Sequence, residues 1–114
     1  MHEAAIAENI IRSLEETLQK KPVEGRIARV FLQVGKLRGV VAENLKFLFE
    51  VLARGSRLEG AGLEVEFVPI AARCLSCGKN FQIEDLLFFC PDCRSPQIDI
   101  VSGNELQVTG LEVD

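Results

Sequence analysis

Apolar residues recur along the first twenty residues with the spacing of one face of a helix. Four of them fall at i, i+4, i+7 and i+11: Ala7, Ile11, Leu14 and Leu18. Polar and charged residues occupy most of the positions between them, and Pro22 cannot continue a helix. We therefore expect a helix over residues 4–19 whose apolar stripe packs on a core.

The next apolar segment, residues 26–34, alternates with the period of two that is typical of a strand. One face carries four apolar residues: Ala28, Val30, Leu32 and Val34. The opposite face carries Arg29 and Gln33, together with the apolar Ile27 and Phe31. Because both faces are partly apolar, this strand is expected at the centre of a sheet.

Three further elements follow from the same two periods. Residues 42–54 show helical spacing, with an apolar stripe formed by Leu45, Leu48, Phe49 and Leu52. Residues 63–68 alternate apolar and acidic positions, which predicts a strand with one solvent-facing side. Residues 105–113 predict a last strand whose apolar positions change parity around Gly110, where a bulge is expected.

The resulting order is helix, strand, helix, strand, cysteine-containing segment, strand. We expect the last strand to return to the first sheet, which makes the cysteine-containing segment an insertion. The fold class is therefore α+β, with two helices packed on a small three-stranded sheet and an inserted four-cysteine lobe similar to a zinc ribbon. The expected boundaries are 1–69 plus 105–114 for the α/β domain and 70–104 for the inserted zinc-binding domain.

All four cysteines lie in the inserted segment, in two Cys-x-x-Cys pairs: Cys74, Cys77, Cys90 and Cys93. Two tight turns that each present two thiolates supply the tetrahedral sulfur set of a closed structural Zn²⁺ site. Disulfides or a redox pair are the alternatives. A redox site needs only one pair beside a helix start, and disulfides suit secreted chains.

Composition narrows the class of protein. The 114 residues include 47% hydrophobic and 26% charged residues and carry a net charge of −4, which is ordinary for a globular chain but unusual for a nucleic-acid binder. The N-terminus lacks the basic and apolar regions of a signal peptide, and no apolar run reaches the length of a membrane span. We expect a cytoplasmic protein that binds neither nucleic acid nor membrane.

The only histidine of the chain is residue 2. The Met1 amine and the His2 amide nitrogen close a five-membered chelate ring, and the His2 imidazole Nδ1 closes a six-membered ring. Three nitrogens in one plane suit Ni²⁺ or Cu²⁺, and the Glu3 amide or carboxylate is a candidate further ligand. A frayed, solvated terminus is the alternative interpretation.

These residues together resemble the HypA/HybF family of hydrogenase nickel-incorporation proteins. The resemblance runs from the Met1–Glu3 terminus through Val34-Gly35-Lys36-Leu37 and the cysteine quartet to Gly103-Asn104-Glu105-Leu106. It covers essentially the full length. The individual pieces are common, but their combination is specific.

The resemblance implies a nickel metallochaperone that is not itself an enzyme. It implies that His2 and its neighbour Glu3 bind the Ni²⁺ cargo in the α/β domain, whereas the four cysteines bind a structural Zn²⁺. The implied partners are a HypB-type GTPase and the large subunit of [NiFe]-hydrogenase, with urease accessory proteins as partners in some organisms. Whether the chain is a monomer or a homodimer stays open.

Three other functions fit parts of the sequence. A zinc-ribbon interaction or nucleic-acid-binding module would need more basic residues than the three of the inserted segment: Arg73, Lys79 and Arg94. A zinc enzyme would need an open coordination position, which four cysteines do not leave. A purely structural adaptor would give no role to the Met1-His2 terminus.

Overall fold

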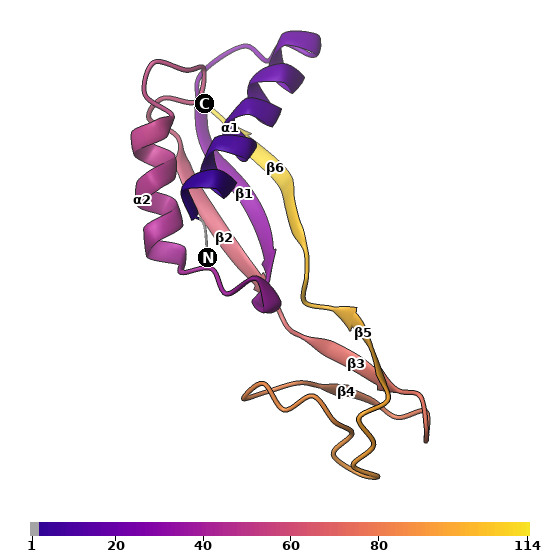
Figure 1. Cartoon of the computed structure of the whole chain (residues 1–114). Coiled ribbons are helices and arrows are strands. Elements are labelled where there is room, and N and C mark those ends of the chain that lie inside the picture. The colour runs from indigo at the N-terminus through magenta and orange to yellow at the C-terminus, as the bar shows by residue number, and fades with distance from the viewer. Residues whose placement is uncertain (1–2) are drawn as a thin grey trace.

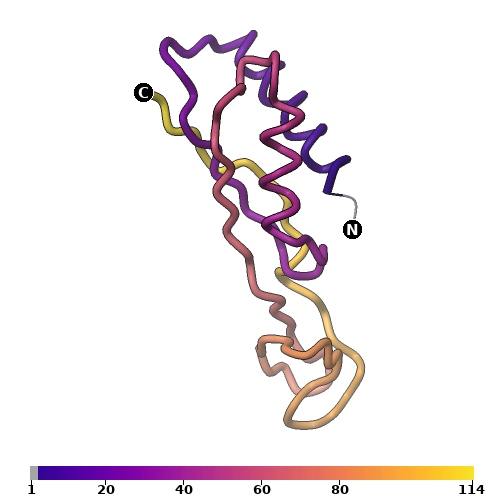
Figure 2. The backbone as a smooth tube through the Cα atoms, turned by 90° about the vertical axis from the view of Figure 1, so that its left-hand side faces the viewer, coloured from indigo at the N-terminus to yellow at the C-terminus, as the bar shows by residue number. Residues whose placement is uncertain are grey.

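Two three-stranded sheets lie end to end in this computed structural model, which describes residues 3–114. The molecule is elongated, with extents of 54 × 25 × 19 Å (Figure 1). Both helices cover one face of the first sheet, and the second sheet forms the opposite end of the molecule (Figures 1 and 2). Neither helix within the described residues has the length and apolar character that crossing a bilayer requires.

The first sheet has the order β2-β1-β6, with β1 (Ile27–Gly35) at its centre. The strand β2 (Gly62–Val68) runs parallel to β1 and β6 (Leu106–Val113) runs antiparallel to it. The central position of β1 and the return of the last strand to this sheet are as predicted from the sequence.

Two bulges set which residues of this sheet face the helices. Thr109 has no partner position on β1, because Phe31 lies opposite Gly110 while Leu32 lies opposite Val108. This bulge switches the parity of β6 and confirms the irregularity expected at Gly110. A second shift skips Ala28 and turns Ile27 into the core, so the prediction that Ile27 lies on the face opposite Val30 is wrong.

The helices are α1 (Glu3–Lys20) and α2 (Ala42–Leu52), close to the predicted ranges. The apolar stripe of α1 is buried as expected. The stripe of α2 is rotated, because Leu45 and Phe49 are fully buried and are followed by buried Ala53, while Leu52 is exposed. A short 3₁₀ helix, η1 (Lys36–Arg38), joins β1 to the loop before α2.

The second sheet has the order β4-β3-β5, formed by β3 (Ala71–Cys74), β4 (Asn80–Gln82) and β5 (Ile98–Ser102). We call residues 70–102, which contain this sheet and both cysteine pairs, the four-cysteine lobe. We call the first sheet with its two helices the α/β core. The α+β class and the inserted cysteine lobe are confirmed, whereas the strands of the lobe were not predicted.

Candidate metal centre

Each cysteine pair lies in a turn with the same backbone hydrogen bonds. In the first turn, the Cys74 N–H donates to the Lys79 carbonyl (2.8 Å) and the Gly78 N–H donates to the Cys74 carbonyl (2.9 Å). In the second turn, the Cys90 N–H donates to Ser95 and the Arg94 N–H donates to Cys90, at 3.0 and 2.9 Å. The chain thus builds one turn twice and presents two thiols from each copy.

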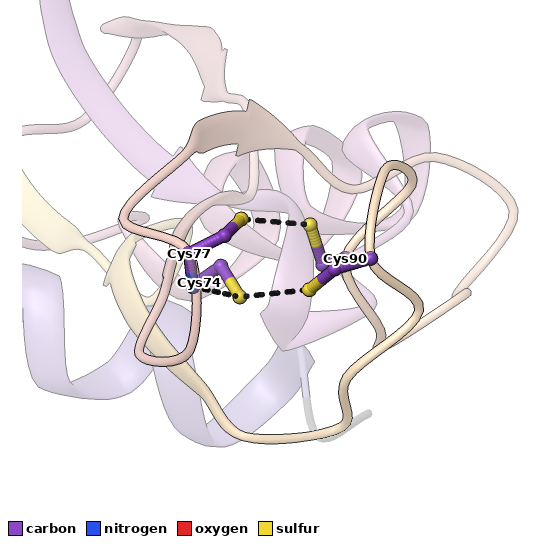
Figure 3. Close-up of side chains that lie close together, drawn as sticks. Cys74, Cys77 and Cys90 are labelled. Atoms are coloured by element: carbon purple, nitrogen blue, oxygen red, sulfur yellow. Dashed lines mark hydrogen bonds between the residues drawn. The ribbon is translucent and has the colours of Figure 1, made fainter.

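The two turns face one another and bring four sulfur atoms together (Figure 3). The Sγ atoms of Cys74 and Cys93 are 3.5 Å apart, and those of Cys77 and Cys90 are 3.7 Å apart. All four lie within 4.8 Å of one another. A disulfide would hold its sulfurs at roughly 2.05 Å, so these four are free thiols.

Each facing pair joins one thiol with a lowered pKa to one with a raised pKa. The Cys77 backbone N–H lowers the pKa of Cys74 to about 6, and the Cys93 backbone N–H lowers the pKa of Cys90. The pKa of Cys93 rises to about 12: the Ser95 backbone N–H favours its thiolate, but the sulfurs of Cys74, Cys90 and Cys77 and partial desolvation together outweigh that bond. A bound dication favours all four thiolates, because its charge offsets their mutual repulsion.

The sulfur positions fit a tetrahedral metal site. A Zn–S bond of roughly 2.3 Å places the sulfurs of a regular tetrahedron about 3.8 Å apart, close to the two separations observed here. Cys74 and Cys90 are buried, whereas Cys77 and Cys93 are exposed at the rim. The four predicted cysteine positions therefore meet in one site that can hold a metal ion.

The apolar run Leu86–Phe89 does not cover the cysteine turns. Leu86 is 69% exposed and Leu87 is 55% exposed, and both phenylalanines are also exposed. The core of the lobe consists instead of Ile70, Ala72 and Ile83, with Phe81 and Ile98 packed against them. The run therefore contributes little to the burial of the metal site.

The predicted nickel residues lie at the other end of the chain. Met1 and His2 fall outside the described residues. Glu3 is the first described residue, and its carboxylate accepts a hydrogen bond of 3.1 Å from the Val41 N–H, directly before α2. The first turn of α1 is thereby tied to the start of α2 on the side of the α/β core that faces the lobe (Figures 1 and 2).

The junction between the α/β core and the four-cysteine lobe is held by backbone contacts that the sequence did not reveal. The Gly35 N–H donates to the Glu105 carbonyl (2.7 Å) and the Leu37 N–H donates to the Gly103 carbonyl (2.8 Å). Arg38 Nε donates to the Asn104 carbonyl at 3.0 Å. A Cβ atom on Gly35 would overlap the Gly103 carbonyl, so any other residue at this position would force the two backbones apart. The sequence feature that could have indicated this contact is the glycine in each of the two segments, Val34-Gly35-Lys36-Leu37 and Gly103-Asn104-Glu105-Leu106.

Fold and site together define a small α+β metal-binding protein with a four-cysteine lobe inserted before its last strand. Comparisons with known proteins agree. Residues 1–113 match the family model described as "Hydrogenase/urease nickel incorporation, metallochaperone, hypA". The chain belongs to this HypA family of nickel-incorporation metallochaperones, and it is a maturation factor rather than an enzyme.

Individual relatives extend the match over the whole chain. The hydrogenase maturation factor HypA of Azotobacter chroococcum mcd 1 is 41% identical over 114 residues, covering 100% of both chains. That of Rhodobacter capsulatus is 37% identical over 113 residues and covers 99% of both. The solution structure of the Ni metallochaperone HypA from Helicobacter pylori superimposes with a TM-score of 0.70 at 25% identity, covering 99% of this chain and 97% of that one.

Proposed function

We propose that this chain carries Ni²⁺ on its N-terminal residues and helps to insert it into the large subunit of [NiFe]-hydrogenase during maturation. The observation that carries the proposal is the position of the only histidine, at residue 2 of a chain that belongs to a nickel-incorporation family. The hydrogenase maturation factors to which the chain is similar support the choice of client.

The proposed nickel ligands are the Met1 amine, the His2 amide nitrogen and the His2 imidazole, with Glu3 beside them. The two fused chelate rings fix three nitrogens in a plane, which suits the tetragonal geometry of Ni²⁺. A terminal site of this kind stays open on one side, and an open site releases its ion more readily than a closed cage. Release to a client is what a metal carrier requires.

For Glu3, we propose that the carboxylate positions the terminus. Its hydrogen bond to the Val41 N–H ties the residue next to His2 to the start of α2. If the Glu3 carboxylate is held by this hydrogen bond, the Glu3 atom available as a further nickel ligand is its amide nitrogen, which directly follows His2. The glutamine variant can preserve the acceptor oxygen, while alanine removes it.

The four-cysteine site is proposed to hold a structural Zn²⁺. Four sulfur ligands leave no position for water or substrate, so such an ion supports the lobe without performing chemistry on a client. We further propose that residues 70–104 fold as a zinc-dependent domain, separate from the nickel-binding domain of residues 1–69 and 105–114. The separate hydrophobic clusters of the two regions support this division.

The proposed partners are a HypB-type GTPase and the nickel-free hydrogenase large subunit, in the cytoplasm. The sequence has no Walker phosphate-binding loop, so nucleotide hydrolysis during maturation must come from a partner. The family description also names urease, and we propose hydrogenase as the client because the curated relatives are hydrogenase maturation factors.

Titration calorimetry with Ni²⁺ tests the proposal on three proteins: the native terminus, a form with one glycine before Met1, and His2→Ala. We expect one Ni²⁺ per chain for the native terminus. The added glycine moves the amine out of the chelate ring and His2→Ala removes the imidazole, so both should lose stoichiometric binding. The zinc content and the circular dichroism spectrum should not change. Nickel binding of native strength in either altered protein would contradict the proposed site.

Glu3 variants separate positioning from ligation. If the carboxylate positions the terminus through its acceptor oxygen, Glu3→Gln should keep most of the nickel affinity and Glu3→Ala should weaken it. Equal losses in both variants would instead indicate that the charged carboxylate is a ligand.

A further inference from the structure

The connection between the two cysteine pairs contains a tight turn with an unusual residue at its apex. The Leu87 N–H donates to the Glu84 carbonyl at 3.2 Å, which closes a four-residue turn. Both central residues have positive φ, +54° at Asp85 and +57° at Leu86. These are the φ signs of a type I′ turn, in which asparagine or aspartate followed by glycine is the favoured pair. Leucine therefore stands where the backbone favours glycine.

A leucine at position 86 lowers the stability of the unbound protein in two ways. A left-handed backbone brings the Cβ of an L-residue close to the following carbonyl, and leucine has no polar side-chain atom that could offset this by a local hydrogen bond. The side chain is also 69% exposed, so little burial compensates for the backbone conformation. Neither the turn nor the lobe core explains why leucine occupies this position.

The surroundings of Leu86 form an apolar surface. Leu87, Phe88 and Phe89 follow it and are all exposed. A hollow of about 230 Å³ lies beside the turn, lined on its apolar side by Phe81, Leu87, Phe89 and Pro91. A protruding leucine next to a hollow with one apolar side is a surface on which another protein can pack. We call Leu86–Phe89 with this hollow the Leu86 patch.

The charges around the Leu86 patch are acidic. Glu84 and Asp85 directly precede Leu86, and both also line the hollow. Lys79 is paired with Asp92 at 2.9 Å, so its charge is already compensated. The complementary surface is an apolar pocket with lysine or arginine at its rim. A second copy of this chain fits poorly, since a two-fold contact through the patch would bring both pairs of carboxylates together.

We propose that the Leu86 patch docks the protein that accepts the metal, on an apolar pocket with a basic rim. This rests on the proposed function, because it names the contact by which the client is held. The first turn of α1 lies on the side of the α/β core that faces the lobe, so a client docked on the lobe would lie on the same side of the core as the start of that helix (Figures 1 and 2). A partner that only hydrolyses nucleotide has no need to lie on that side.

The test measures binding of the full-length, zinc-loaded chain to the nickel-free hydrogenase large-subunit precursor of the same organism, by biolayer interferometry. Leu86→Gly removes the side chain and supplies the residue that the turn favours. We expect the affinity for the precursor to fall about tenfold or more, as for the loss of a central apolar anchor. The melting temperature should rise by about 4 °C, because backbone strain is relieved.

Two further variants complete the test. Val101→Ser changes an exposed apolar residue of the lobe on β5, outside the cysteine turns, and the affinity of this variant for the precursor should stay within about twofold of the unaltered chain, as at a residue outside a hot spot. Glu84→Lys should weaken binding at low salt, because the new lysine repels the basic rim of the partner. The effect should disappear at high salt, where ions screen this repulsion.

The outcomes separate this inference from the proposed function. If the unaltered chain binds the precursor and Leu86→Gly binds equally well, the docking role of the patch is overturned while the proposed client stands. If the unaltered chain does not bind the precursor, the proposed client and this inference both fail. A change of oligomeric state in Leu86→Gly would show that the occupant is a second copy of the chain, which also overturns the proposal.

Discussion

The α/β core and the four-cysteine lobe are stabilised in different ways. Among the described residues, 17 buried apolar residues form one cluster in the α/β core, where both helices pack on the first sheet. The corresponding cluster of the lobe has three: Ile70, Ala72 and Ile83. The lobe compensates with backbone hydrogen bonds in its cysteine turns and with four convergent sulfurs.

From this difference we expect that the lobe requires a metal ion to fold and that the core does not. The lobe spans residues 70–102, and chains below roughly 40 residues usually need disulfides or metals to fold. Its thiols are not joined by disulfides, so we expect a bound metal ion to supply much of the stability that the small cluster lacks. The lobe is also fastened at the junction, where Gly35 and Leu37 bond to the connection 103–105.

Metal removal is expected to produce the largest difference between the lobe and the core. A structural zinc site contributes roughly 10–16 kcal/mol of apparent binding free energy at neutral pH. Chelation should therefore remove the hydrogen-exchange protection of β3–β5 while β1 and β2 keep theirs, as followed by mass spectrometry. Cys74→Ser should reproduce this pattern with zinc present. Protected β3–β5 amides after complete chelation would show that the lobe does not depend on metal.

Truncation of the largest buried side chain tests the α/β core. Phe49 is 0% exposed, and Phe49→Ala should lower the free energy of unfolding in urea by about 3–5 kcal/mol. Phe47 lies on the same helix and is 64% exposed, so Phe47→Ala should change the free energy of unfolding by less than about 0.5 kcal/mol. Both variants should retain zinc. Similar losses in the two would contradict the packing of α2 described here.

The junction is expected to respond to a single added methyl group. Gly35→Ala places a Cβ against the Gly103 carbonyl, and overpacking of this kind costs about 1–3 kcal/mol. The matched control is Gly62→Ala, where the nearest atom is 3.9 Å away and no loss is expected. Urea unfolding gives the energies, and NMR shifts should move at residues 35–38 and 103–105 only in Gly35→Ala. A neutral Gly35→Ala would disprove the close approach.

The smallest predicted effect compares the two cysteine turns with each other. The first turn ends at Gly78 with φ +81° and the second at Arg94 with φ +62°, a conformation that favours glycine. Arg94→Gly should stabilise the loaded lobe by about 1 kcal/mol, which is about fivefold in zinc affinity measured against a competing chelator. Gly78→Ala should weaken zinc binding by a similar factor. If neither substitution changes the affinity, the two turns are not constrained as described.

Much of the α/β core could be predicted because its elements follow the helical and strand periods. The exceptions have local causes: a bulge at Ala28 turns Ile27 inward, and a rotation of α2 buries Ala53 rather than Leu52. Neither cause is visible in periodicity. Both depend on how neighbouring strands and helices pack.

The cysteine spacing predicted the metal site but not the lobe around it. Strands β3, β4 and β5 are three to five residues long, too short to show a period, and they pair across the cysteine turns. By composition alone, the apolar run Leu86–Phe89 would be assigned to burial. Its exposure follows from a turn whose positive φ angles no local pattern indicates.

The proposed function requires two different metals in two separate sites, nickel at the N-terminus and zinc in the four-cysteine lobe. X-ray absorption at the nickel and zinc edges, on protein with a native terminus and one equivalent of each metal, tests this directly. We expect nickel with nitrogen and oxygen ligands only, and zinc with four sulfur ligands at about 2.3 Å. Sulfur ligands on nickel, or a loss of sulfur ligands from zinc on nickel loading, would contradict it.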